Sequence, residues 1–183
     1  MYMPRVSRER SLSLSIVLVI VLGLVSILAF TSCRPDHSGV SWDYDGGSGC
    51  GAYVGLAEDA ADETGLDLAL IMGVMRVESN FRAEAESGAG AQGLMQVMPG
   101  TGRHFDCGEL FDPGENIICG ARVLAKYIKT CRGDITYGVA AYNTGLKRAR
   151  AWQKKGRTPA NKGYVRKVLD ARRRFARHGC GGF

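Results

Sequence analysis

The hydrophobic pattern of the chain is strongest between Asp67 and Glu78. From Leu68 to Val77 only Arg76 is charged, and apolar residues occupy every side of the helical wheel. A helix with apolar residues all round is buried rather than amphipathic. Asp67 can cap its start, because a carboxylate accepts hydrogen bonds from the free amides of a first turn. We therefore predict a central buried helix that ends inside the fold at Glu78.

Weaker patterns predict further helices around this central one. They cover Tyr53 to Glu63, a short stretch after Met98, Asn116 to Lys129, Ile135 to Tyr142 after a capping Asp134, and Lys162 to Arg177. The first of these ends at Gly65, where glycine supplies the left-handed stop. No strand pattern is convincing beyond a few residues beside the expected cleft. The predicted fold class is therefore mainly α, with at most a minimal β element at the cleft.

The first 33 residues are typical of an export signal rather than of a folded segment. Three arginines within the first ten residues precede a charge-free run from Ser11 to Cys33 that is rich in leucine, isoleucine and valine. Such a run is a secretion signal or an uncleaved membrane anchor. Small residues before Cys33 resemble the bacterial lipobox, whose cysteine is lipidated, although Phe30 stands where an aliphatic residue is usual. Both a lipoprotein and a plain signal anchor remain open.

The rest of the chain divides into a linker, one domain and a tail. Residues 34–51 lack apolar periodicity and are rich in glycine, serine and aspartate, which is typical of a flexible linker. The folded domain is expected over residues 52–177, and residues 178–183 are expected to be a C-terminal tail. With 183 residues, of which 45% are hydrophobic, the chain can form one domain with a core. We expect an exported protein of the periplasm or cell envelope, tethered to a membrane through its N-terminus.

The charge of the chain is mildly basic. Its formal net charge is +6, and two of these charges lie before Cys33. A basic surface suits an anionic polymer. Nucleic acid is not expected as a partner, because the excess is small and no basic stripe is interleaved with aromatic residues.

Glu78 is the candidate acid/base residue. A carboxyl that loses water has a raised pKa, and a pKa near roughly 6–7 suits a group that gives a proton to a leaving group and takes one back. A single glutamate at a helix end is more often solvated or paired, and Arg76 or Arg82 offers such a partner.

The residues after Glu78 favour a ligand cleft. Ser79 and Ser87 offer hydroxyl groups, and residues 87–93 are too small and flexible to pack a core. Such a stretch allows backbone to approach a ligand. Gln96 then presents an amide that can both donate and accept, which suits sugar hydroxyls and N-acetyl groups.

These residues carry a family resemblance. The pattern Glu78-Ser79-x-Phe81, then Ser87, then Gly90-Ala91-x-Gly93-Leu94-Met95-Gln96 with Pro99 beyond, resembles the soluble lytic transglycosylase domain. Ala141-Tyr142-Asn143-x-Gly145 resembles a third motif of that family, and Tyr164-Val165 a fourth. The resemblance covers about Ala52 to Arg174. It implies a lysozyme-like helical fold, related to goose-type lysozyme, and cleavage of peptidoglycan.

The resemblance also implies roles for individual residues. Glu78 would be catalytic, Tyr164 would reach its carboxyl, and Asn143 would bind substrate. The residues expected to bind substrate are Ser79, Ser87, Met95, Gln96, Tyr142, Asn143 and Tyr164. Many members carry a glutamate shortly before the fourth motif, and residues 159–163 contain none. No cofactor is implied, and the expected partners are peptidoglycan glycan strands.

The expected reaction follows from having one well-placed carboxylate. Common glycoside hydrolases use two, whereas Asp106, Glu109 and Asp112 lie in polar loops and are predicted to be solvated or to cap helices. The family implies that a substrate hydroxyl replaces the second carboxylate and leaves a 1,6-anhydro end. Two alternatives stay open: a hydrolase like goose-type lysozyme, and a catalytically weak wall-binding assembly factor.

Six cysteines in an exported chain indicate disulfides. We predict a bridge between Cys107, in the loop before a long helix, and Cys119, near the start of that helix. Lipidation of Cys33 would leave one of the other three cysteines unpaired, and the sequence does not say which. A metal site is rejected, because no C-x-x-C spacing occurs and only three histidines are present.

Overall fold

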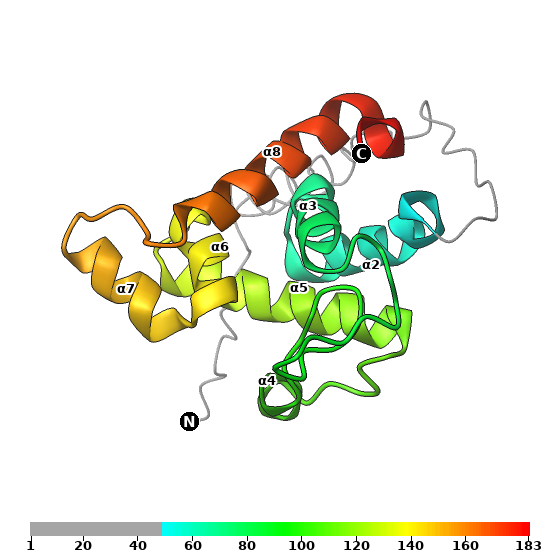
Figure 1. Ribbon diagram of the computed structural model, residues 1–183, viewed down its shortest axis with the longest axis horizontal. Helices are drawn as coiled ribbons and strands as arrows, with labels where there is room; N and C mark the ends of the chain where they lie inside the picture. The colour runs from blue at the N-terminus through cyan, green and yellow to red at the C-terminus, as the bar shows by residue number, and fades with distance from the viewer. Residues whose placement is uncertain (1–48) are drawn as a thin grey trace, which may run out of the picture. The chain divides into compact units, whose positions relative to one another are not determined.

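The computed structural model of the protein describes residues 49–183, and these are mainly helical (Figure 1). No strand forms in this part of the chain, where isolated β-bridges join Glu86 to Gln92 and Gln92 to Val97. The prediction of a mainly α fold with a minimal β element is confirmed. The elements in chain order are η1 (Cys50–Tyr53), α2 (Val54–Thr64), α3 (Leu68–Glu78), α4 (Pro99–His104), α5 (Pro113–Thr130), α6 (Ile135–Thr144), α7 (Leu146–Lys154), α8 (Lys162–His178) and η2 (Gly179–Gly182).

Helix α3 is the buried centre of the domain. Every residue from Ala69 to Met75 is buried, and the Asp67 side chain accepts from the Ala69 amide at 3.0 Å. A Cβ on Gly73 would lie 2.9 Å from main-chain atoms of Val168 and Arg172. The absence of a side chain at Gly73 therefore lets α8 cross α3 almost backbone to backbone, as Figure 1 shows.

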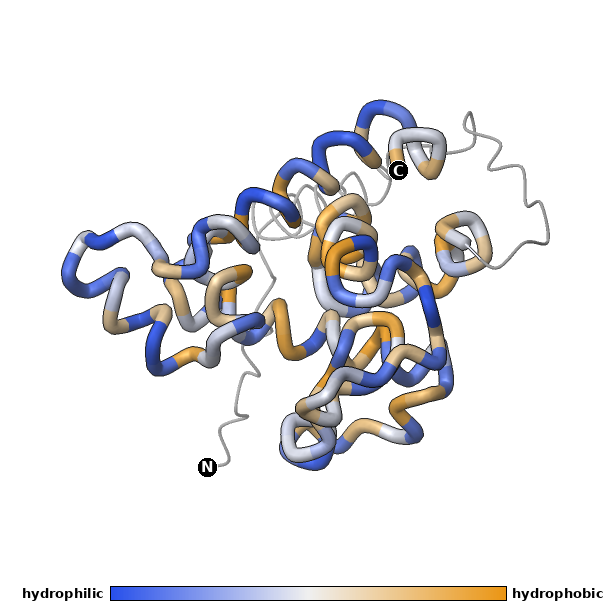
Figure 2. Tube along the Cα trace, in the orientation of Figure 1, coloured by the Kyte–Doolittle hydropathy of each residue, from blue (hydrophilic) through white to orange (hydrophobic). Residues whose placement is uncertain are grey.

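Helix α8 covers α3 with a narrow apolar face. Its buried residues are Val165, Val168, Ala171 and Phe175. Most of the other residues of α8 are hydrophilic, as the colouring of the trace in Figure 2 shows. This division lets one helix both close the core and present a charged surface.

Helix boundaries agree with the sequence patterns except in two places. Helix α5 begins three residues earlier than predicted, because Asp112 caps it and Pro113 occupies its first turn. Helix α7 was not predicted. In its sequence, LKRARAWQK, only Ala149 is buried, so no apolar periodicity marks the helix.

Two disulfides close the domain. Cys107 pairs with Cys119 as predicted, with the two Cα atoms 5.7 Å apart. Cys50 pairs with Cys180 across 130 residues, and Cys131 is buried and free. Residues 178–183, expected to be a tail, contain η2 and are joined through Cys180 to the beginning of the described chain.

Several predictions concern residues 1–48, which lie outside the described residues. They are the export signal, lipidation of Cys33 and most of the linker. Between Gly49 and Phe183 no helix is both long enough and apolar enough to cross a membrane.

Candidate active site

Glu78 is the last residue of α3, and its carboxyl group is only partly exposed. The Tyr164 hydroxyl donates to Glu78 Oε1 at 2.5 Å. Burial raises the pKa of the Glu78 carboxyl above its ordinary value, and the hydrogen bond from Tyr164 opposes part of that rise. The predicted desolvation of this carboxyl is therefore present, and it favours the protonated form that a general acid needs.

Two tyrosine hydroxyls lie close to Glu78, one from α6 and one from α8. Tyr164 is in the first turn of α8, and Tyr142 is near the end of α6, where its hydroxyl donates to the Met95 carbonyl at 2.9 Å. Burial raises the pKa of both tyrosines well above the ordinary value, and the negative charge of Glu78 raises each further. Both groups therefore remain protonated donors.

The backbone directly after Glu78 is in an unusual conformation. Asn80 and Phe81 have φ of 53° and 61°, which is the left-handed region that favours glycine. The buried Phe81 ring lies 5.3 Å from the ring of Phe183, which in turn lies 5.8 Å from that of Phe175. The Arg76 guanidinium lies 5.7 Å from the Phe183 ring centre. Packing against the C-terminal segment thus holds the turn that follows Glu78.

Both predicted serine hydroxyls have structural partners. Ser79 is only 2% exposed, and its Oγ donates to the Leu94 carbonyl at 2.8 Å. Ser87 Oγ accepts from the Ala91 amide at 2.9 Å, within the loop of small residues. These contacts fold residues 79–97 back toward α3 and give that loop a defined shape.

Met95 and Gln96 form the part of the loop nearest Tyr142. The Met95 side chain is fully buried, and its main-chain carbonyl accepts from the Tyr142 hydroxyl. Gln96 has a φ of 51°, and its Nε2 donates to the carbonyls of Ala85 and Gly93. The Gln96 amide oxygen remains available to accept a hydrogen bond.

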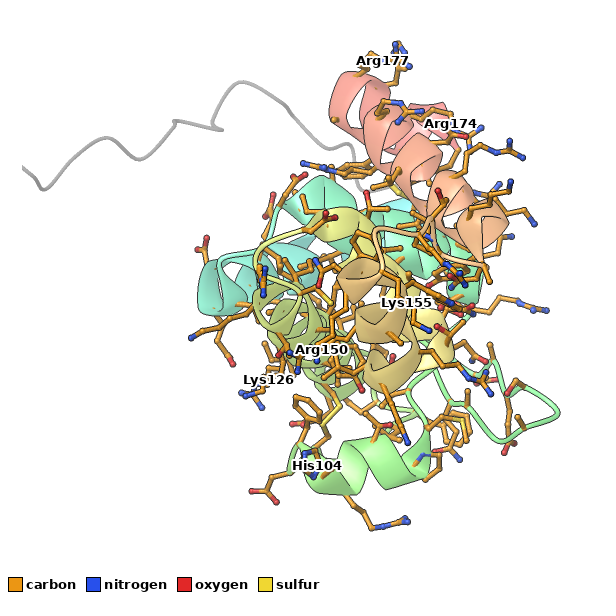
Figure 3. The ribbon with its side chains drawn as sticks, turned by 90° about the vertical axis from the view of Figure 1, so that its left-hand side faces the viewer. His104, Lys126, Arg150, Lys155, Arg174 and Arg177 are labelled. Atoms are coloured by element: carbon orange, nitrogen blue, oxygen red, sulfur yellow. A yellow bond between two sulfur atoms is a disulfide. The ribbon has the colours of Figure 1, made fainter. Side chains whose placement is uncertain are left out.

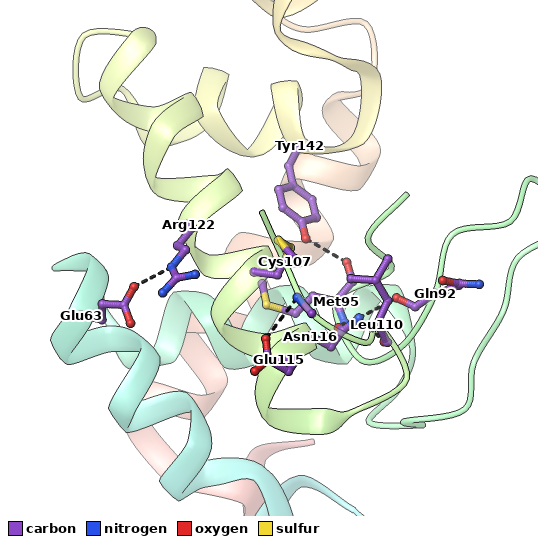
Figure 4. The surroundings of a disulfide bond; sticks show 11 residues. Glu63, Gln92, Met95, Cys107, Leu110, Glu115, Asn116, Arg122 and Tyr142 are labelled. Atoms are coloured by element: carbon purple, nitrogen blue, oxygen red, sulfur yellow. Dashed lines mark hydrogen bonds and ion pairs between the residues drawn. A yellow bond between two sulfur atoms is a disulfide. The ribbon is translucent and has the colours of Figure 1, made fainter. Parts of the chain in front are cut away.

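Asn116 in α5 fixes this loop, and no pattern in the sequence indicates that role. It is fully buried, and its Oδ1 accepts from the Met95 amide at 2.7 Å. Its Nδ2 donates to the carbonyls of Gln92 at 2.9 Å and Leu110 at 2.7 Å (Figure 4). One side chain therefore satisfies three buried main-chain groups of two loops.

Asn143 follows Tyr142 at the exposed end of α6. Its Oδ1 accepts from Asn161 Nδ2 at 3.0 Å, and the same Asn161 group donates to the Ala140 carbonyl at 3.2 Å. Asn161 lies in the stretch that lacks the family's glutamate, and it joins the end of α6 to the start of α8. The Asn143 amide nitrogen remains free to donate.

The family model described as Transglycosylase SLT domain matches residues 55–165, which is more than half of the chain. The protein belongs to the SLT domain family. This range includes Glu78, both tyrosines, Asn116 and Asn143.

Proteins similar in sequence to this chain carry transglycosylase names. The chain is 36% identical over 90 residues to a transglycosylase of Enterobacteria phage PRD1, covering 49% of this chain and 34% of that protein. It is 33% identical over 121 residues to the soluble lytic murein transglycosylase of Escherichia coli K12, covering 54% and 19%. It is 40% identical over 111 residues to membrane-bound lytic murein transglycosylase C of Mannheimia succiniciproducens, covering 51% and 31%. The chain thus spans about a third or less of the length of these relatives.

Solved structures of the SLT family share the fold. The 70 kDa soluble lytic transglycosylase of Escherichia coli matches with a TM-score of 0.62 and 30% identity, over 69% of this chain and 24% of that one. An inactive glutamate-to-glutamine mutant of the lytic transglycosylase Slt from Pseudomonas aeruginosa matches with a TM-score of 0.54 and 32% identity, over 67% and 22%.

Several other carboxylates of the SLT domain are engaged away from Glu78. Asp67, Asp112 and Asp134 cap helices α3, α5 and α6. Glu63 pairs with Arg122, and Glu115 accepts from the Gly108 amide. Among residues 49–183 no group of histidine, cysteine and carboxylate side chains is arranged to hold a metal ion.

Proposed function

We propose that the protein is a peptidoglycan lytic transglycosylase. It cleaves the β-1,4 bond between N-acetylmuramic acid and N-acetylglucosamine without water and leaves a 1,6-anhydro end. The observation that carries the proposal is the single carboxyl of Glu78, whose pKa burial raises and which Tyr164 contacts.

Glu78 acts first as an acid and then as a base. Its protonated carboxyl donates to the glycosidic oxygen as the bond to C1 of the muramyl residue breaks. The resulting carboxylate accepts the proton of the muramyl C6 hydroxyl while that oxygen bonds to C1. The proton count of the enzyme is restored, and the substrate acetamide stabilises the positive charge at C1. Tyr164 stabilises the carboxylate between the two steps, because its hydroxyl donates to Oε1.

A second carboxylate is not required for this route. Hydrolases of the common type hold two carboxyl groups about 5–10 Å apart across the scissile bond. Here the neighbours of Glu78 are the hydroxyls of Tyr164 and Tyr142, which stay protonated. This arrangement favours attack by a hydroxyl of the substrate over activation of water.

The free hydrogen-bonding atoms around Glu78 suit an N-acetylated sugar. We assign Asn143 as a donor, because its oxygen is occupied by Asn161, and Gln96 as an acceptor, because its nitrogen is occupied by main-chain carbonyls. Ser79, Ser87, Met95 and Tyr142 contribute by shaping the loop that the substrate contacts. Several relatives carry names that include murein transglycosylase, which supports peptidoglycan as the substrate.

The test is mass spectrometry of the products released from purified peptidoglycan sacculi. Muropeptides ending in 1,6-anhydro sugars are expected, and these are lighter by one water than products with reducing ends. Reducing ends would establish a hydrolase like goose-type lysozyme. Release of no product by the full chain, with binding to sacculi retained, would establish a wall-binding assembly factor.

We further propose that the chain is exported and anchored to a membrane through Cys33. Relatives named as membrane-bound support an envelope location. In cells, Cys33→Ala should abolish labelling by a palmitate analogue and leave either an unprocessed precursor or released protein. A variant that stays membrane-bound at unchanged size would show that the apolar run is a plain signal anchor.

A further inference from the structure

The basic charge of the chain is concentrated in α7, α8 and the loop that joins them. Residues 146–183 contain thirteen lysines and arginines and a single acidic residue, Asp170. Residues 49–145 contain seven basic and thirteen acidic residues. The modest net charge of +6 therefore combines an acidic part with a strongly basic one.

Most of these basic side chains are exposed and unpaired. Within the described residues, Arg172 pairs with Asp67 and Arg173 with Asp170. The other eleven are exposed, and none of them forms an ion pair with another residue between Gly49 and Phe183. We call them the cationic surface. They are Lys147, Arg148, Arg150, Lys154, Lys155, Arg157, Lys162, Arg166, Lys167, Arg174 and Arg177.

The cationic surface extends over α7, the loop after it and the outer side of α8. Figure 3 shows Arg150 on α7, Lys155 directly after that helix, and Arg174 and Arg177 near the end of α8. Between Lys147, Arg150 and Lys154 lies an open hollow of about 540 Å³. A second hollow, of about 220 Å³, lies beside Lys162 and Arg166. Both are edged by amines and guanidinium groups, which bind phosphate oxygens.

We propose that the cationic surface docks the domain on a membrane rich in anionic phospholipids, with headgroup phosphates against α7 and α8. Charges spread over two helices fit a planar array of phosphates better than one narrow polymer strand. Single-stranded nucleic acid would favour aromatic side chains among the cations, and Trp152 is the only aromatic residue between Leu146 and Asn161. The proposal does not depend on the glycosidic chemistry of Glu78.

The sequence places the domain within a short distance of any membrane that holds the apolar run before Cys33. The charge-free apolar run ends at Cys33, and residues 34–48 separate it from the first described residue. Fifteen residues span at most about 50 Å when fully extended. A membrane that holds this run is therefore the anionic surface that the domain meets at the highest effective concentration.

The expected attraction is large at low salt and short in range. Each lysine or arginine near an anionic bilayer contributes about 1 kcal/mol to the binding free energy, which raises the association constant about fivefold. The attraction decays within about 8 Å at physiological ionic strength. Several of the eleven cations near headgroups would therefore suffice for salt-sensitive docking.

The test uses the full chain reconstituted with vesicles of phosphatidylcholine alone or with 30% phosphatidylglycerol. After flotation, an amine-reactive reagent labels exposed lysines, which are quantified by mass spectrometry. On anionic vesicles we expect roughly fivefold protection of Lys147, Lys155 and Lys167, which high salt removes. Lys129 on α5 serves as the internal reference and should label equally on both vesicles.

Charge-reversal variants separate position from total charge. The triple variant Arg150→Glu, Lys154→Glu, Arg174→Glu should lose the protection. The matched triple variant Arg103→Glu, Lys126→Glu, Arg132→Glu changes net charge equally and should keep it. Equal labelling on both vesicles, equal loss in both variants, or failure to float with anionic vesicles would overturn the proposal. Protection by a soluble polyanion such as heparin, without protection by vesicles, would assign the surface to a polymer instead.

Discussion

The two sides of the candidate active site differ in what their polar groups contact. On the side of α3 and α8, the Tyr164 hydroxyl contacts another titratable side chain, the carboxyl of Glu78. On the side of the loop and α5, Asn116, Ser79 and Gln96 contact main-chain atoms. The first side contains a group whose protonation can change, whereas the polar groups named on the second side do not titrate.

The two tyrosines near Glu78 differ in the same way. Like Tyr164, Tyr142 is buried near Glu78, but its hydroxyl donates to the Met95 carbonyl rather than to the carboxyl. Proximity to the acid is therefore a weaker guide to function than the partner of the hydrogen bond. Substitutions on the two sides should separate activity from stability.

The largest effect is expected for Glu78→Gln, which keeps the shape of the side chain and removes its titratable proton. Turnover should fall about a thousandfold, which is roughly 4 kcal/mol in the barrier. The variant should be at least as stable as the parent at neutral pH. Burial raises the pKa of Glu78, so the folded state binds more protons than the unfolded state and the parent loses stability as pH rises through that pKa. Lysis of sacculi and thermal melting measure the two quantities, and a variant with a tenth of parental activity would exclude Glu78 as the acid.

On the opposite side, Asn116→Ala should act on stability. It leaves the Met95 amide and the carbonyls of Gln92 and Leu110 without a partner. Each unsatisfied buried group costs about 1–3 kcal/mol, so a loss of about 4 kcal/mol in the free energy of unfolding is expected after partial relaxation. Denaturant unfolding measures it, with the exposed Asn143→Ala as a control. Asn143→Ala should reduce substrate affinity and leave stability nearly unchanged.

The Cys107–Cys119 bridge should likewise contribute to stability and not to catalysis. The short loop it closes gives about 3 kcal/mol in the chain-entropy model. Replacing Cys107 by Ser together with Cys119 by Ala should lower the melting temperature and preserve kcat. The variant Cys131→Ala, which removes a free buried thiol, should have a smaller effect. Equal losses in the two variants would mean that side-chain packing, not the covalent link, explains the result.

Tyr164→Phe should change activity and its pH dependence. The lost hydrogen bond stabilises the ionised carboxyl, so the pKa of Glu78 should rise further. The alkaline limb of the kcat profile, where Glu78 loses the proton it must donate, should therefore move to higher pH. At neutral pH we expect a decrease of about tenfold, roughly 1.4 kcal/mol. An unmoved alkaline limb would show that Tyr164 does not act through the carboxyl.

The smallest effect is expected for Tyr142→Phe. It removes one hydrogen bond to the Met95 carbonyl and should cost about 1 kcal/mol of stability. The pH profile should keep its position, since the Tyr142 hydroxyl does not donate to Glu78. A shift as large as that of Tyr164→Phe would remove the distinction between the two tyrosines.

The sequence predicted the parts of the structure that local patterns encode. The apolar run from Leu68 to Val77 gave the central helix, and its end gave the buried carboxyl. The nearby cysteines 107 and 119 could be paired because both belong to one helix and the loop before it. The contact of Tyr164 with Glu78 followed from the family resemblance and not from spacing.

Long-range partnerships could not be predicted in this way. Asn116 interrupts no pattern, and only the fold shows that three main-chain groups meet its amide. The pairing of Cys50 with Cys180 depends on where residues 130 positions apart come together. The left-handed conformation of Asn80 and Phe81 is held by Phe183, which no local preference indicates.

The Cys50–Cys180 disulfide also determines how the domain responds to mechanical force. Tension on the chain before Cys50 passes through the covalent bond to Cys180, at the far end of α8. It bypasses η1 and α2, which would otherwise be peeled away first. While the bond is intact, the residues between the two cysteines form a closed loop, so unravelling from the N-terminal side would have to detach α8 together with α2. The oxidised domain therefore resists unravelling from its N-terminal side more strongly than the same domain with Cys50 and Cys180 reduced.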